Sequence, residues 1–282
     1  MDGRKVAGLK RSLSSRLEHY LDTMKAIVNS YFLAEVLAFN DHQKAYLIHD
    51  WCSFCVTKSC QSLATITLIL KSGYPEDALI LLRSVYECYL STVFVINNPD
   101  RIDDFIQKPV GIITGRYNHP RTKKHRTHYR QIVVKETGEV IPYGVTVRQL
   151  AKGSPYPSDL KLYDFLYPFL SEMVHPHIVN SGNYRHDVDG WRFCHRQKHD
   201  DIAPWVLILY IYTLLLAECY ELEDLDQPED SMLRNNIRKG AETLMKSLSY
   251  LSQVDRLDET ELILLNERFS ETTKAKWFFR SC

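Results

Sequence analysis

The sequence predicts an all-α protein, a multi-helix bundle with a basic, partly irregular insertion. Three observations support this fold class. Apolar residues recur at intervals of three and four over most of the chain, which is the period of an amphipathic helix. The segment from Pro75 to Pro99 is apolar on nearly every side, which is typical of a helix inside a bundle. The 282 residues are 45% hydrophobic, which is enough for a large core.

Two helices are expected before this central segment. The first runs from Ser12 to about Phe39, where an Asn-Asp pair follows it. The second runs from about His42 to Ser72, and Gly73 suits the left-handed conformation of a helix C-cap. Each carries its apolar residues on one stripe, so both are predicted to be amphipathic.

The central helix is expected to span roughly 20 residues and about 30 Å. Pro75 with two acidic residues behind it marks the start, and an Asn-Asn-Pro sequence marks the stop. Two charges lie inside this apolar stretch, Arg83 and Glu87, four residues apart and hence on one face. A charge in apolar surroundings is costly unless a partner satisfies it, so this pair needs a structural or a functional reason.

Residues 108–157 are predicted to be an insertion between two parts of one bundle, residues 1–107 and 158–282. Glycine and proline become frequent there, helical periodicity fades and positive charge accumulates. Gln131–Val134 and Val140–Tyr143 flank a turn-like Glu-Thr-Gly-Glu sequence, which predicts a small β-hairpin. A short helical pattern returns at Val145–Ala151.

Four helices are expected after the insertion. The first, Ser158 through Val174, contains Pro168, which should kink or divide it. The second, Ile202 to about Leu225, is almost entirely apolar in its first part. The last two are expected at residues 229–251 and 258–272. A polar stretch, residues 178–199, is expected to have little regular structure.

Composition limits the classes of function and location. Lys plus Arg and Asp plus Glu both count 35, so net charge gives no reason to expect a polyanion partner for the whole chain. We recognise no secretory signal, and the apolar stretch Ile202–Ala217 is shorter than the roughly 20 residues that cross a bilayer. We therefore expect a cytoplasmic protein with no membrane partner. Seven scattered cysteines, among them Cys52, Cys55 and Cys60, favour reduced, buried thiols over a zinc site.

The first candidate site combines the charges of the central helix with the end of a later one. Ser171 and His175 are again four residues apart, and a helix C-terminus stabilises a protonated imidazole. We expect Arg83, Glu87 and His175 to share a polar pocket. Ser171 and Tyr86 would complete it. In the alternative interpretation, Arg83 and Glu87 form a structural ion pair that fixes the packing of the helix.

Two motifs in these helices resemble the paired signatures of a known family. They are LxRSxxExxL at Leu81–Leu90 and LSxxxHP at Leu170–Pro176, in the expected order. From about Asp50 to Tyr220 the chain resembles the bacterial helical family numbered fifty-six seventy-seven among domains of unknown function. That family is similar in architecture to the HEPN superfamily of helical bundles, found in toxins and abortive-infection proteins, many of them metal-independent ribonucleases.

The resemblance implies a ribonuclease toxin or antiphage defence effector that needs no metal or other cofactor. An arginine would stabilise the scissile phosphate and a histidine would be the general acid or base, while the RNA's own 2′-hydroxyl attacks. The superfamily signature, an Arg followed after four to six residues by a His, occurs only at Arg121/His128 and Arg192/His199, in predicted loops, which is as often as chance predicts. Arg83 and His175 would take the place of that pair.

The second candidate site is the basic segment, residues 116–130, which has six Lys or Arg, three His and two Tyr but no acid. Dense positive charge interleaved with aromatic rings suits single-stranded nucleic acid, because cations bind phosphates and rings stack on bases. The alternative is a solvated, flexible loop. The residues expected to contact RNA are Arg116, Arg121, Lys123, Lys124, Arg126, His128 and Arg130.

A third group of polar side chains consists of His175, His177, His186, Asp187, Asp189, His195 and His199. His195 and His199 have the i,i+4 spacing of helical metal ligands, but no helix is expected there. We expect exposed loop histidines and no metal site.

Two hypotheses of function follow. In the first, the protein is an RNA-cleaving enzyme with Glu87 orienting Arg83 and the basic segment guiding the substrate. In the second, it is a non-catalytic binding or sensor subunit of a defence complex, and the Arg/Glu/His cluster is purely structural. A homodimer is a further expectation, because long apolar helices in such bundles often pair.

Overall fold

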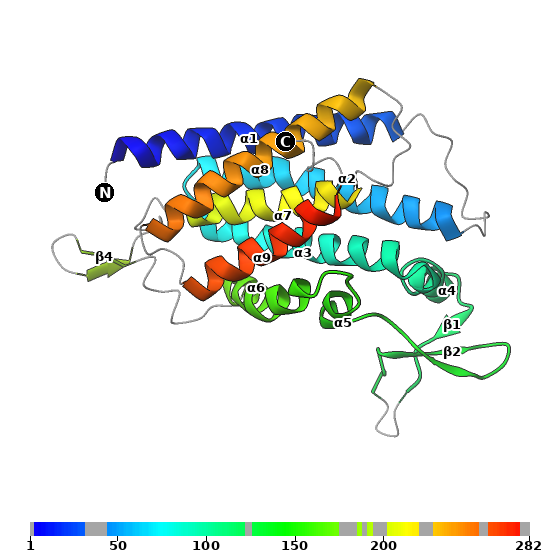
Figure 1. Ribbon diagram of the computed structural model, residues 1–282. Coiled ribbons are helices and arrows are strands. Elements are labelled where there is room, and N and C mark those ends of the chain that lie inside the picture. The colour runs from blue at the N-terminus through cyan, green and yellow to red at the C-terminus, as the bar shows by residue number, and fades with distance from the viewer. Residues whose placement is uncertain are drawn as a thin grey trace.

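The computed structural model of the chain describes residues 3–31, 44–121, 126–174, 185–187, 191–193, 202–219, 228–253 and 259–276. Within these ranges the chain forms nine α-helices, one 3₁₀-helix and five short strands. The long helices lie side by side, and a small sheet projects from one end (Figure 1). The predicted all-α, multi-helix fold is therefore confirmed.

Three long helices open the bundle, namely α1 (Gly3–Tyr31), α2 (Lys44–Lys71) and α3 (Pro75–Asn97). α1 begins earlier than its apolar stripe predicted because Val6 and Leu9 also pack against the core. Its predicted end near residue 39 lies outside the described residues. α2 and α3 end close to their predicted stops, and Gly73 between them has a φ of 83°, as a C-cap requires.

Four helices follow the insertion, as predicted. They are α6 (Ser158–Val174), α7 (Ala203–Cys219), α8 (Pro228–Gln253) and α9 (Glu259–Ala275). α6 runs through Pro168 without being divided. Pro168 lies on the exposed side of the helix, where water can satisfy the carbonyl group that loses its partner. The opposite side stays in the core through buried leucines at positions 162, 166 and 170.

α3 and α7 form the centre of the core. Every residue of α7 from Ile208 to Cys219 is buried, and this helix packs against α1, α2, α3, α8 and α9. In Figure 1, α1 and α8 lie along one side of α7, and α6 lies beyond α3 on the other. α2 and α3 are long and apolar enough to cross a membrane, but 67% of the apolar window of α3 is buried inside the protein, as in a core helix.

η1 (Pro99–Asp104) leads into the insertion, which contains most of α4 (Gln107–Ile113) near its start and α5 (Val147–Lys152) near its end. Between them lies an antiparallel sheet of β1 (Tyr117–Asn118), β2 (Gln131–Val134) and β3 (Val140–Pro142), in that order. The predicted hairpin of β2 and β3 is thus confirmed, with Gly138 in its turn at a φ of 71°. α4 and β1 were not predicted, because each is too short to produce a periodic pattern.

Residues 178–199, which were expected to have little regular structure, contain two short strands. β4 (Arg185–Asp187) and β5 (Trp191–Phe193) pair antiparallel. This differs from the prediction, because strands of three residues give no recognisable alternation of polar and apolar positions.

Candidate functional site

A polar cluster joins α3 to α6 at the surface of the bundle. It consists of Arg83, Glu87 and Tyr167, and we call it the α3–α6 cluster. Arg83 Nη2 donates a 2.7 Å hydrogen bond to the Tyr167 hydroxyl, which donates to Glu87 Oε1 at 3.2 Å. Arg83 Nε lies 3.4 Å from the same Glu87 oxygen, and the guanidinium carbon lies 4.8 Å from the centre of the Tyr167 ring. The cluster therefore includes a tyrosine that was not among the predicted site residues.

The α3–α6 cluster is partly exposed. The side chain of Arg83 keeps 27% of its exposure and that of Glu87 keeps 40%. Although α3 is apolar on nearly every side, one strip of the helix therefore reaches solvent next to α6. A charged ligand can therefore reach the guanidinium.

Electrostatics keep the cluster polar at neutral pH. Partial burial opposes the charge of Arg83, but the Tyr167 hydroxyl and the Glu87 carboxylate raise the pKa of the guanidinium. Burial also raises the pKa of Tyr167, although Arg83 opposes this effect. The arginine is thus cationic and the phenol protonated, so each keeps its hydrogen-bonding role in the cluster.

The other residues predicted for this site are not all near it. Ser171 lies one turn after Tyr167 on α6 and donates to the Tyr167 carbonyl oxygen at 2.6 Å. Tyr86 is fully buried and stacks on Tyr89 with ring centres 6.0 Å apart, so it faces the core. His175 lies outside the described residues, directly after the described end of α6.

The basic segment forms an arm that includes β1 and projects beside α4 (Figure 1). Its predicted RNA-contacting residues are exposed wherever the structure describes them; Lys123 and Lys124 lie outside the described residues. Arg116 lies 5.6 Å from the centre of the Tyr117 ring, and Arg121 bridges to Thr127 through the backbone. The described part of the arm therefore has a defined backbone conformation.

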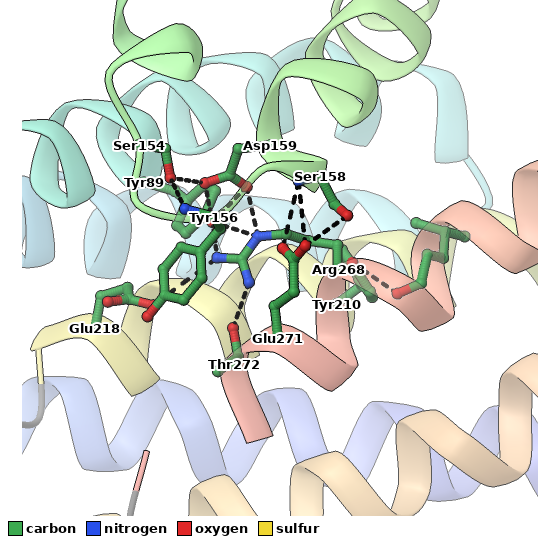
Figure 2. Close-up of polar contacts among 11 residues, drawn as sticks. Tyr89, Ser154, Tyr156, Ser158, Asp159, Tyr210, Glu218, Arg268, Glu271 and Thr272 are labelled. Atoms are coloured by element: carbon green, nitrogen blue, oxygen red, sulfur yellow. Dashed lines mark hydrogen bonds and ion pairs between the residues drawn. The ribbon is translucent and has the colours of Figure 1, made fainter. Parts of the chain in front are cut away.

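A second polar cluster lies in the core, with Arg268 of α9 at its centre (Figure 2). Arg268 Nε donates to Asp159 Oδ1 at 2.5 Å and to the Tyr89 hydroxyl at 3.1 Å. Tyr89 in turn donates to Asp159 Oδ1 at 2.8 Å. Arg268 Nη1 donates to Thr272 Oγ1 at 2.6 Å, and the guanidinium carbon lies 3.8 Å from the centre of the Tyr156 ring.

The charges of this core network are balanced. Lys276 Nζ lies 2.9 Å from Glu218 Oε2, and Arg268 Nη2 lies 3.9 Å from the other oxygen of Glu218. Burial opposes the charge of Arg268, but the surrounding tyrosines and carboxylates raise its pKa well above the usual value. Arg268 and Asp159 are both 0% exposed, so neither can meet a substrate. The core network is therefore a structural link between α3, α6, α7 and α9.

A comparison with protein families adds to this geometry. Residues 49–190, just over half of the chain, match DUF5677, which is described as a family of unknown function. The chain belongs to the DUF5677 family. The match begins where the resemblance placed it and ends at residue 190 rather than near residue 220. No curated protein and no solved structure matches the chain.

The DUF5677 region contains the whole α3–α6 cluster, the basic segment and Asp159 of the core network. Arg268, Glu218 and Lys276 lie beyond its C-terminal limit, on α7 and after it. The core network thus ties the DUF5677 region to the helices that complete the bundle.

The sequence carried a signal for the core network that was not recognised. Arg268 lies three residues after Leu265 and directly before Phe269, inside the apolar stripe of α9, where a charge needs a buried partner. Asp159 could not have been identified as that partner, because an acid in the first turn of a helix is common without any such role.

The remaining candidate groups are the metal-ligating side chains and the cysteine thiols. Among the described ranges, no group of three or more His, Cys, Asp or Glu side chains is arranged to hold a metal ion. Of the predicted histidine group, the described backbone includes only two members, both in β4; the others lie outside it. The expected burial of Cys52, Cys55 and Cys60 is confirmed, and burial raises the pKa of the Cys52 thiol to about 12.

Proposed function

We propose that this DUF5677 protein is a metal-independent endoribonuclease, acting as a toxin or antiphage defence effector, and that the α3–α6 cluster binds the scissile phosphate. The observation that carries the proposal is the partly exposed guanidinium of Arg83, held in place by Tyr167 and Glu87. A guanidinium fixed in this way can offer two parallel N–H groups to a phosphate. The proposal includes a similarity to HEPN ribonucleases, and the reaction mechanism below is taken from that similarity.

The proposed reaction uses the RNA's own 2′-hydroxyl. Its oxygen attacks phosphorus while the bond from phosphorus to the 5′-oxygen breaks, which leaves a 2′,3′-cyclic phosphate and a 5′-hydroxyl. One group must accept the proton of the 2′-hydroxyl, and another must donate a proton to the 5′-oxygen. His175 is the proposed acid or base, because imidazole titrates near neutral pH. Arg83 stabilises the charge that develops on the phosphate oxygens.

A surface path for a single strand supports RNA as the substrate. Tyr163 and Tyr167 stack on α6 with ring centres 5.0 Å apart, next to Arg83. One residue after Tyr163, Asp164 pairs with Arg148 of α5 at 3.7 Å. Arg148 also lines a pocket with Tyr129 and Arg130 of the basic segment, so it lies between that segment and α6.

A second candidate function is a non-catalytic binding or sensor subunit of a defence complex. It is favoured by one observation, namely that Arg83, Glu87 and Tyr167 contact one another through hydrogen bonds and an ion pair without a ligand. In that case the cluster fixes the packing of α3 on α6. The basic segment would then bind RNA without cleaving it.

Expression in a bacterial host tests the choice between the two functions. The enzyme hypothesis expects growth arrest and fragmented cellular RNA with the wild type, and neither with Arg83→Ala or His175→Ala. Circular dichroism must show that both variants fold. Folded variants that remain fully toxic, or a wild type that leaves RNA intact, would favour the binding subunit.

A further inference from the structure

A pocket of about 540 Å³ opens between the small sheet and α5. Its walls include Tyr129, Arg130, Tyr143, Arg148 and Lys152. We propose that this pocket binds a nucleoside phosphate, with the tyrosine rings holding the base and the three cations holding the phosphate. Its volume lies within the range of about 300–1,000 Å³ that is usual for small-molecule sites.

The charge of the pocket favours an anion. Three of its lining side chains are cationic and none is acidic. Neither Arg130 nor Lys152 forms an ion pair with another residue in the part of the chain that the structure describes. Arg148 has a partner, Asp164, but the 3.7 Å pair is 61% and 55% exposed and therefore contributes little. Arg148 can thus exchange its carboxylate for a phosphate at low cost.

The aromatic walls are positioned before any ligand arrives. Tyr129 is 71% exposed, which is unusual for a ring of this size. The His119 ring forms edge-to-face pairs with both Tyr129 and Tyr143, with ring centres 5.3 and 5.2 Å apart. His119 is itself held because its Nδ1 donates to the Gln131 carbonyl oxygen at 2.9 Å. The two tyrosines therefore present fixed faces on which a base can stack.

The backbone around the pocket is also fixed. The Tyr143 amide donates to the Arg130 carbonyl oxygen at 2.9 Å, which continues the hairpin past β3. Thr146 and Gln149 bond to each other in the capping box of α5. Since Thr146 Oγ1 and Gln149 Oε1 already have partners, the cations, the tyrosines and the side-chain amide nitrogen of Gln149 are the groups left to recognise a ligand.

Two sources can supply this ligand. It is either a free nucleotide or one unit of a single-stranded RNA that continues towards the α3–α6 cluster. The second source rests on the proposed function, but the first does not. Purified full-length protein is titrated with AMP, with a fluorescently labelled oligoadenylate and with inorganic phosphate. AMP is expected to bind and to displace the oligoadenylate; inorganic phosphate that binds as tightly as AMP would overturn recognition of the nucleoside.

Variants locate the binding. Tyr129→Ala is expected to weaken AMP binding about tenfold or more, in line with the usual contribution of a base stack. Lys152→Glu is expected to weaken AMP binding by a similar factor, because it replaces a phosphate-binding cation with an acid. Tyr129→Phe, which keeps the ring, should bind like the wild type. Lys239→Glu, the same charge reversal on an exposed position of α8, is the matched control and should also bind like the wild type. Unchanged affinity for AMP in both Lys152→Glu and Tyr129→Ala would overturn the assignment.

The comparison of AMP with oligoadenylate separates the two sources, and a further variant separates this site from the cleavage site. Oligoadenylate that binds more tightly than AMP indicates RNA, because its additional phosphates contact the basic segment. Equal or weaker binding indicates a free nucleotide. Arg83→Ala should leave AMP affinity unchanged. A protein that cleaves no RNA but binds AMP through Lys152 and Tyr129 would therefore refute the proposed enzyme and still support the pocket.

Discussion

The guanidinium of Arg83 and the hydroxyl of Tyr167 meet at 2.7 Å, although 84 positions separate them in the chain. Tyr89 and Asp159 connect the same two helices at 2.8 Å, inside the core. α3 and α6 are thus joined twice, once where solvent reaches the side chains and once where it does not. The first contact is available for chemistry, whereas the second serves stability.

Removal of the Tyr167 hydroxyl tests whether it positions Arg83. Tyr167→Phe should reduce the free energy of unfolding by about 1 kcal/mol or less, because the contact is partly exposed. The rise in the activation free energy of RNA cleavage should exceed this loss of stability, since the guanidinium loses one of the two groups that orient it. Tyr163→Phe, one turn earlier on α6, is the matched control and should change neither quantity.

Two ion pairs join α6 and α9, one in the core through Arg268 and one at the surface through Lys161. Loss of the core pair should destabilise the protein much more than loss of the surface pair. Arg268→Met should destabilise the protein by about 3–5 kcal/mol, because it leaves the buried Asp159 carboxylate without a cation. Lys161→Met removes a surface pair with Glu267 and should cost about 1 kcal/mol or less. Urea unfolding measures both. Equal losses would mean that Asp159 does not depend on Arg268.

Buried tyrosines predict a loss of stability at alkaline pH. Burial raises the pKa of Tyr86, Tyr89 and Tyr212 well above the value of 10.0 that an unfolded chain has. Their contribution is fully present below pH 10 and is lost as the pH rises above it, because only the unfolded state then releases these protons. The loss is up to about 1.4 kcal/mol per pH unit for each tyrosine.

The free energy of unfolding, followed together with tyrosinate absorbance, checks this behaviour. Ionisation of the buried tyrosines should coincide with unfolding. Tyr129→Phe removes an exposed hydroxyl group and is the control, which should not alter the alkaline loss of stability. Independent titration of every tyrosine before unfolding would show that the hydroxyls are not buried.

Two helical glycines should respond to alanine in opposite directions. A Cβ atom at Gly240 of α8 would clash with the hydroxyl of Tyr20, which is buried and hydrogen-bonded to Thr213 at 2.9 Å. Gly240→Ala should therefore cost about 1–3 kcal/mol. A Cβ atom added at Gly8 of α1 would meet no other atom within 4 Å, so Gly8→Ala should stabilise the protein by roughly 0.5–1 kcal/mol. Thermal unfolding of both variants measures the two effects.

The sequence predicted most of the helices because the amphipathic ones leave a periodic signal and the apolar ones are bounded by recognisable start and stop residues. α3 is the clearest case, since Pro75 opens it and an Asn-Asn-Pro sequence closes it. The β2–β3 hairpin was predictable from its turn, where glycine supplies a positive φ. Short elements such as α4 and β1 were not, because their contacts come from the rest of the fold rather than from a local pattern.

The candidate site was only partly predictable. The spacing of Arg83 and Glu87 identified one polar strip of α3, but nothing local indicated that Tyr167 would lie across it. The core network was missed because its members come from four helices distant in the chain. Pairings of this kind depend on how helices pack, whereas spacing within a single helix depends only on its period.

The most direct test of the central claim compares two labelled single strands that differ at one sugar. One strand is all RNA, and the other carries a 2′-deoxyribose at the position where the wild-type protein cuts. The account predicts cleavage of the first strand to a 2′,3′-cyclic phosphate, no cleavage of the second at that position, and a rate about 100-fold lower with Arg83→Ala. Intact RNA with the wild type, or an unchanged rate with folded Arg83→Ala, would contradict it.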